Sequence, residues 1–228
     1  HREIWIMLKP YETKLQNIKE EIQQIGVSVI EALEICLKAL NDRRIEDLSN
    51  VEISEKKILL KSNEIDNIIV GTLALYSPEA KDLRRLVSFL KITNELVRTG
   101  SNAKDFAKMF KKSYSDDLNT NMILEYTIPL LRSALLSLQT SISIIDETNP
   151  NHIEEKYHRV IVEESKTDDL YLMIEKNILK LISKNLDLSK EYFDILSALR
   201  RLEKIADRAV SMANLFHFAQ VGGDIVQS

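Results

Sequence analysis

Four carboxylate residues in the second half of the chain have a spacing that could support metal chemistry. Glu203 and Asp207 are four residues apart, so on a helix they share one face, and Glu164 and Asp168 repeat this spacing. If the two faces meet, four negative charges converge, and buried carboxylates need protons, basic partners or a bound cation. A cation held by oxygen ligands is therefore one interpretation of the pattern.

A solvated ion-pair surface is the other interpretation. Acidic residues four positions apart are common on charged helices, and neighbouring basic side chains could neutralise all four carboxylates. These neighbours are Arg200, Arg201, Lys204 and Arg208. The spacing alone leaves both interpretations open.

Other chemistries have less support in the sequence. Glu155 and His158 form one Glu-x-x-His pair, whereas a ferritin-like di-iron centre needs two such pairs and further glutamates. His152, His158 and His217 have no ligand spacing, and we expect them at the surface or at helix ends. Cys36 lies in an apolar stretch without an activating neighbour, and five glycines cannot supply a phosphate-binding loop. We therefore predict no catalytic residue, no cofactor-binding residue and no enzymatic activity.

The composition indicates which elements position these residues. The chain has only five Gly and four Pro in 228 residues, whereas strand-rich folds need frequent turn residues. With 44% hydrophobic and 29% charged residues, it is predicted to be all-α. A net charge of −4 gives no field that attracts nucleic acid. No apolar run approaches the roughly 20 residues that span a bilayer, so we expect no membrane insertion. The single cysteine cannot form an internal disulfide, which suits a reducing cytoplasm, and we expect no nucleic-acid binding.

Apolar residues at steps of three and four predict six long antiparallel helices. We expect them from Pro10 to about Asn41, from Ile45 to Tyr76, from Ser77 to about Phe110, from about Asp117 to Ile145 with a kink at Pro129, from about His152 to Lys184, and from Ser189 to about Ala219. In the third, Ser77 is the expected N-cap and Pro78 the first helical residue. A polar stretch at 111–117 separates two predicted domains, 7–112 and 117–220, with tails at 1–6 and 221–228.

The two predicted domains have related sequences. A shift of 106 residues aligns Leu96 with Leu202 and Ala103 with Ala209 without a gap. Each domain also contains three predicted helices. The pattern therefore favours an internal repeat that forms two tandem three-helix bundles.

Three segments resemble the PhoU family of phosphate-signalling proteins. They are residues 74–84, with Pro78 followed by Asp-Leu-Arg, residues 91–100, and residues 202–209. The family pattern is a helix start with Pro and Asp-Leu-Arg and then Leu-Glu-Arg-Ile-Gly-Asp, once in each three-helix unit. The resemblance covers the chain from about Met7 to Ala219. It implies two three-helix bundles, usually a homodimer, without known catalytic activity.

The resemblance also implies a function. PhoU proteins are cytoplasmic negative regulators of phosphate uptake and phosphate-starvation signalling. They couple a phosphate ABC transporter, through its ATPase subunit, to a PhoR-type sensor histidine kinase. The alternative is a metal-dependent hydrolase, or a metal-storing helical protein, that uses the carboxylates of the second bundle.

Some members of the family bind metal clusters through Glu/Asp-x-x-x-Asp motifs, one set in each bundle. By this resemblance the second-bundle set falls on Glu164, Asp168, Glu203 and Asp207, and the cation would be iron, zinc or magnesium. The first-bundle set falls on Ser62, Asp66, Val97, Ser101 and Asp105. Val97 cannot bind a metal and the serines are poor ligands, so we expect a site only in the second bundle. There, Ala206 replaces the family glycine and Ser211 the usual third polar ligand.

Overall fold

The computed structural model describes residues 2–222, and over that range it consists of six α-helices and three short 3₁₀ helices. The α-helices are α1 (Arg2–Asn41), α2 (Glu55–Tyr76), α3 (Ala80–Ser113), α4 (Thr120–Ser143), α5 (Pro150–Lys184) and α6 (Ser189–Val221). The 3₁₀ helices are η1 (Ile45–Asn50), η2 (Ile144–Asp146) and η3 (Leu186–Leu188). The all-α prediction with six long helices is confirmed. Most of the expected C-terminal tail, residues 223–228, lies outside the described residues.

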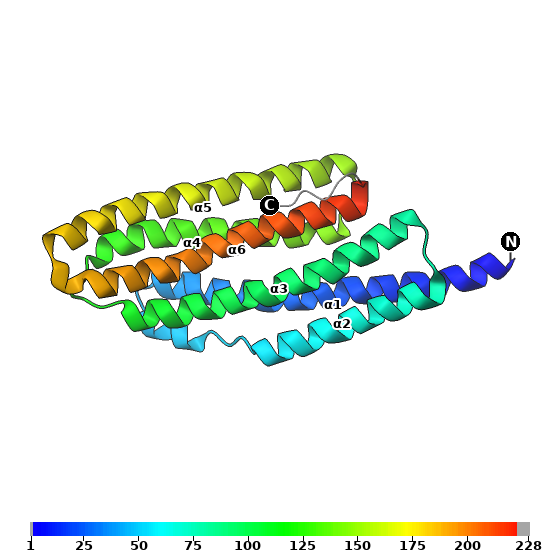
Figure 1. The fold of residues 1–228 in the computed structure, drawn as a ribbon, viewed down its shortest axis with the longest axis horizontal. Coiled ribbons are helices and arrows are strands. Elements are labelled where there is room, and N and C mark those ends of the chain that lie inside the picture. Colours follow the sequence, from blue (N-terminus) through cyan, green and yellow to red (C-terminus); the bar gives the residue numbers. More distant parts are fainter. Residues whose placement is uncertain (1, 223–228) are drawn as a thin grey trace.

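The six helices lie along the long axis of the molecule and form two three-helix groups (Figure 1). One group contains α1, α2 and α3, and the other contains α4, α5 and α6. The groups join mainly through α3 and α6, which share the most extensive contact between any two elements, while α1 also packs on α4. Their buried residues form one continuous hydrophobic core. The exact domain boundaries, 7–112 and 117–220, stay predictions.

The central contact confirms the repeat at the level of packing. Leu96 and Leu202 are both fully buried, and so are Ala103 and Ala209. Small side chains on both helices allow the two backbones to approach closely, because side-chain size sets the distance between packed helices. Cys36, which lies in an apolar stretch of the sequence, is also fully buried.

The second helix begins later than expected. Instead of one helix from Ile45, the chain forms η1, continues without helix through residues 51–54, and begins α2 only at Glu55. The Ser54 hydroxyl accepts a hydrogen bond from the Lys57 backbone N–H at 3.3 Å and so caps the helix. The prediction was wrong because it followed the apolar spacing and overlooked this cap.

Two other predicted helix starts are wrong. The first helix begins at Arg2 and contains Pro10, so the expected tail at residues 1–6 is helical from its second residue. Residues 2–9 include good helix formers, and one proline removes only one hydrogen bond from a helix of 40 residues. Ser77 does not cap the third helix: it ends α2 in a left-handed conformation with φ 41°, and Glu79 is the N-cap of α3.

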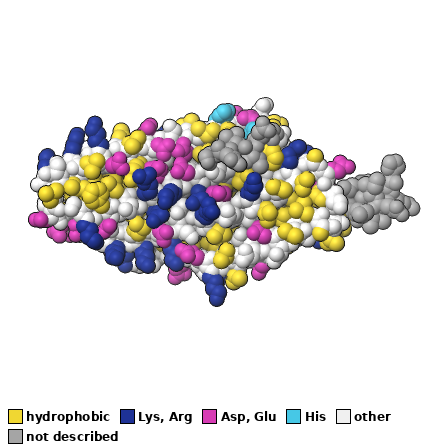
Figure 2. Space-filling model, in the orientation of Figure 1, with side chains coloured by type: hydrophobic (Ala, Val, Ile, Leu, Met, Phe, Trp, Pro, Cys, Tyr) yellow, Lys and Arg dark blue, Asp and Glu magenta, His cyan; other side chains and the backbone are white. Residues whose placement is uncertain are grey.

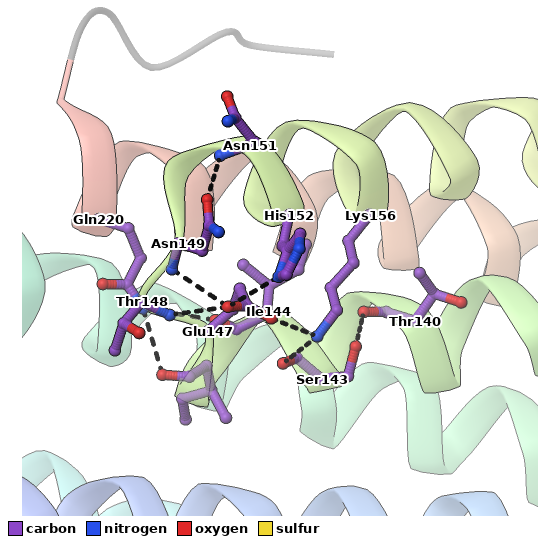
Figure 3. Close-up of polar contacts among 11 residues, drawn as sticks. Thr140, Ser143, Ile144, Glu147, Thr148, Asn149, Asn151, His152, Lys156 and Gln220 are labelled. Carbon is purple, nitrogen blue, oxygen red and sulfur yellow. Dashed lines mark hydrogen bonds and ion pairs between the residues drawn. The ribbon is translucent and has the colours of Figure 1, made fainter.

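A polar network fixes the turn between α4 and α5 (Figure 3). The Glu147 carboxylate accepts backbone N–H bonds from the two residues that follow it, both at 3.1 Å, and pairs with Lys156 at 3.3 Å. The bond from the Asn149 N–H is the main cause that lowers the pKa of Glu147. Gln220 of α6 donates to the carbonyl of Ile144 at 3.3 Å. These contacts join the turn to the first turns of α5 and join η2 to the end of α6.

Helix α4 combines an internal proline with a very apolar sequence. Pro129 lies inside the helix as expected, and the kink stays a prediction. The segment Thr120–Asp146 is long and apolar enough, by length and composition, to cross a membrane, although polar residues interrupt its apolar runs. Of its most apolar window, 56% is buried inside the protein, and Leu130 and Leu131 are fully buried in the core. This is typical of the core helix of a bundle.

Candidate metal centre

The structure brings three of the four predicted carboxylates together between α5 and α6. Carboxylate oxygens of Glu164, Asp168 and Asp207 lie within 4.8 Å of one another. We call these three residues the carboxylate cluster. Among the residues that the structure describes, it is the one group of three or more His, Cys, Asp or Glu side chains with this geometry. Figure 2 shows acidic side chains gathered over the junction of the two helices.

The cluster lies at the rim between core and solvent because of its position on each helix. On α5, Thr167 and Tyr171 are buried beside the two acids, and on α6 Leu202 and Ala206 are buried next to theirs. The carboxylates occupy the neighbouring positions on each helix, where they point along the boundary of the core. They are consequently close together and still reachable from solvent.

The fourth predicted ligand, Glu203, lies beside the cluster. Its Oε1 is 3.8 Å from Nη1 of Arg200, whose guanidinium carbon lies 4.8 Å from the centre of the Tyr171 ring. Arg200 is thus held between an aromatic face and a carboxylate. Burial raises the pKa of Glu203, and the charges of Asp168 and Asp207 add to this against the opposing effect of Arg200.

Basic side chains near the cluster have other partners. Arg208 points to α3, where its Nη1 lies 3.2 Å from Oε2 of Glu95, and Arg200 pairs with Glu203. None of the salt bridges within residues 2–222 involves the carboxylate cluster. The solvated ion-pair interpretation therefore accounts for Glu203 but not for the other three acids. Sequence reasoning missed the Glu95–Arg208 pair because it links the two bundles.

The cluster changes the protonation of its own members. Burial is the main cause that raises the pKa of Glu164 from 4.5 to about 8, and hydrogen bonding to Asp168 and Asp207 and the charges of these two residues contribute to the rise. Burial and Asp168 also raise the pKa of Asp207. Glu164 accordingly holds a proton at neutral pH, which relieves part of the repulsion. A cation could replace that proton, because metal ligands bind in their deprotonated form.

The corresponding first-bundle residues are engaged differently. Asp66 accepts a hydrogen bond of 2.7 Å from the Thr93 hydroxyl, and Ser62 is buried with 4% of its surface exposed. Val97 replaces a carboxylate on α3. The structure brings no group of three potential metal ligands together from this set within the described chain.

The histidines lie apart from the cluster. His152 and His158 are exposed, as predicted. His217, near the end of α6, is half-buried, and its Nε2 contacts a carboxylate oxygen of Glu154 of α5, whose other oxygen lies 3.9 Å from His158 Nε2. Glu154 and His217 are distant in sequence, so local spacing could not reveal this contact.

The fold and the site define a duplicated three-helix-bundle protein with a carboxylate cluster in its second bundle. The family described as the PhoU domain matches this chain twice, at residues 22–110 and 130–216. The chain belongs to the PhoU family.

Relatives and solved structures match over most of the chain. The Clostridium acetobutylicum protein named phosphate-specific transport system accessory protein PhoU homolog is 24% identical over 206 residues, or 90% of this chain and 91% of the relative. The Serratia marcescens accessory protein PhoU is 22% identical over 223 residues, or 94% and 86%. The crystal structure of PhoU from Pseudomonas aeruginosa has a TM-score of 0.80 at 19% identity and covers 93% of this chain and 100% of that one. The phosphate transport system regulatory protein PhoU from Streptococcus pneumoniae has a TM-score of 0.77 at 18% identity, with coverage of 96% and 100%.

Proposed function

We propose that this protein is a cytoplasmic accessory protein of a phosphate-specific transport system and a negative regulator of phosphate uptake. It couples the ATPase subunit of the transporter to a PhoR-type sensor histidine kinase, and it works as a homodimer. The double match to the PhoU domain carries the proposal. Relatives with the accessory-protein name, aligned along nearly the whole chain, support it.

Binding, and not catalysis, is the mechanism that fits this role. The single cysteine is buried, and burial raises the pKa of its thiol to about 12, so the thiol stays protonated and unreactive. The long helices offer extended faces for partner proteins. A partner conformation that these faces bind more tightly becomes more populated, which is how an adaptor transmits the state of the transporter to the kinase.

A deletion and pull-down experiment tests the regulatory role. Deleting the gene in its host should raise phosphate uptake and the expression of phosphate-starvation genes at high phosphate, and the parent chain supplied in trans should reverse both. A tagged parent chain should retain the ATPase subunit. Unchanged expression together with no retained ATPase would overturn the proposal.

A metal ion at the carboxylate cluster is a second proposal, supported by the three converging carboxylates. Oxygen-only ligands favour hard cations, so magnesium, manganese or iron fits this set better than zinc, which usually takes nitrogen or sulfur ligands. Glu164, Asp168 and Asp207 would hold the ion, and the carboxylate of Glu203 lies beside them and would interact with its charge. The ion would neutralise the cluster and link α5 to α6.

Calorimetry with Mn²⁺ on Asp168→Asn and Asp66→Asn tests the metal proposal, since both changes remove one aspartate charge. Asp168→Asn should weaken Mn²⁺ binding more than about 100-fold, because loss of a ligand exceeds the effect of losing a supporting residue. Asp66→Asn should bind like the parent. Phosphatase assays on the loaded protein separate the alternatives: turnover that Asp168→Asn abolishes would favour the hydrolase, and bound metal without turnover favours the regulator.

A further inference from the structure

We propose that a basic pocket on the first bundle binds a nucleoside polyphosphate. The pocket lies between the C-terminal half of α3 and η1 and has a volume of about 490 Å³. Four lysines surround it: Lys104, Lys108, Lys111 and Lys112. Figure 2 shows basic side chains along the lower left edge of the molecule, over this part of α3. The site is independent of the proposed role in phosphate transport.

The lysines form a row of positive charge that the protein neutralises only in part. Lys104 lies 3.7 Å from Glu55, and Lys111 donates a hydrogen bond to the Ser49 hydroxyl. Lys108 and Lys112 are exposed and take part in none of the ion pairs or hydrogen bonds found among the described residues. The charged amino groups of these two lysines are thus available to a ligand.

Helix stability does not explain the whole row. Lys111 and Lys112 lie in the last turn of α3, where positive charge favours the helix dipole. This effect fades within one turn, so it does not reach Lys104 or Lys108. Lys104, Lys108 and Lys112 are spaced by four, so like charges repel along one helix face. A ligand with several negative charges would relieve that repulsion.

The shape and lining of the pocket indicate the class of ligand. From Lys104 to Lys112 the row extends about 12 Å at 1.5 Å per residue, which suits an extended anion better than a single phosphate. Val51, which is partly exposed, and the edges of the buried Leu48 and Ala107 form an apolar floor that a flat ring can contact. The volume falls in the range of small-molecule sites, roughly 300–1,000 Å³. A nucleoside diphosphate or triphosphate combines these features, with its phosphates on the lysines.

Fluorescence anisotropy with mant-ADP, in the presence of EDTA to keep the carboxylate cluster free of metal, tests this site. The parent chain should bind mant-ADP, and unlabelled ADP should displace it. The Lys108→Ala/Lys112→Ala variant should bind at least about tenfold more weakly, because it loses the two free cations. The matched control is Lys81→Ala/Lys91→Ala, which removes the same charge from exposed positions elsewhere on α3.

Each outcome supports or overturns the proposal. Weaker binding by the pocket variant with parent-like binding by the control supports it. Equal loss in both variants would show a general charge effect and overturn it, as would the absence of binding by the parent. Pyrophosphate that competes as well as ADP would also overturn it, because the apolar lining would then contribute nothing. Circular dichroism checks that both variants fold, and Lys108→Glu should abolish binding if charge at this position acts directly.

Discussion

The two bundles share a buried core but carry their charged clusters at different places, and each cluster corresponds to uncharged or weakly polar residues at the equivalent positions of the other copy. Helix α6 has Glu203 and Asp207 where α3, 106 residues earlier, has Val97 and Ser101. Conversely, the four pocket lysines of α3 correspond to Val210, Asn214, His217 and Phe218 on α6. The same buried core packs both copies, whereas the exposed residues of α3 and α6 differ. Each bundle therefore carries a different candidate binding site.

A difference in helix length explains why the basic pocket forms at the end of α3. In the second bundle, α5 has 35 residues, and its first turns cover the end of α6, where the Tyr157 ring lies 5.1 Å from the His217 ring. In the first bundle, α2 has only 22 residues and begins at Glu55. The equivalent end of α3 therefore faces η1 and residues 51–54, and the pocket opens there.

The largest expected effect on stability comes from changes in the buried core that both bundles share. Leu96 and Leu202 are equivalent and fully buried at the centre of the molecule. Leu96→Ala and Leu202→Ala should each lower the free energy of unfolding by about 2–5 kcal/mol, through lost burial and the cavity left behind. Urea denaturation of both variants measures this. A loss below about 1 kcal/mol in only one variant would break the equivalence of the two copies.

The next prediction concerns the pH dependence of metal binding at the carboxylate cluster of the second bundle. Below pH 8 the raised pKa of Glu164 means that a metal ion must displace a proton from this carboxyl group. The affinity for Mn²⁺ should therefore rise with pH by up to about tenfold per unit between pH 6 and 8 and level off above that range. Calorimetry across this range measures the change.

Glu164→Gln is the control for the pH effect. This variant should bind Mn²⁺ more weakly and with a flatter pH profile, because it lacks the displaced proton.

In the metal-free parent, the carboxyl group of Glu164 makes the folded protein less stable as the pH rises. Its pKa rises from 4.5 to about 8 on folding, so its contribution to stability is present below pH 4.5 and is lost as the pH rises through 8. An affinity for Mn²⁺ that falls from pH 6 to 8 would contradict the proposal that Glu164 is a metal ligand.

The sequence predicted features that depend on local periodicity and missed those that depend on tertiary contact. The spacing of Glu164 from Asp168 placed both on one face of α5. The sequence also predicted the start of α6 at Ser189 and that of α5 to within two residues, at His152 instead of Pro150. It did not show that Arg200 would turn to Glu203 and leave three acids together. That choice depends on where the Tyr171 ring lies, which only the packing of α5 on α6 decides.

A smaller effect on stability is expected at the position where one copy has glycine and the other has alanine. Ala206 of α6 is fully buried and is equivalent to Gly100 of α3. Ala206→Gly should lower the free energy of unfolding by about 1–2 kcal/mol, because glycine disfavours a helix interior and a buried methyl group is lost. Thermal unfolding measures the change. An unchanged stability would indicate that α3 and α6 relax at this position.

The reverse change, Gly100→Ala, should have the smallest effect. An added Cβ would lie 3.1 Å from Cδ1 of Ile58 and 3.7 Å from Cγ2 of Val29. The closer atom is the tip of a flexible side chain in the first turn of α2, beside residues 51–54, so it can move by a few tenths of an ångström. The gain in helix propensity, about 1 kcal/mol, then outweighs the crowding. We expect a net stabilisation of about 0.5 kcal/mol by urea denaturation. A loss of more than about 1 kcal/mol would mean that Ile58 is fixed, and that the first bundle keeps its glycine because α2 packs too closely for alanine.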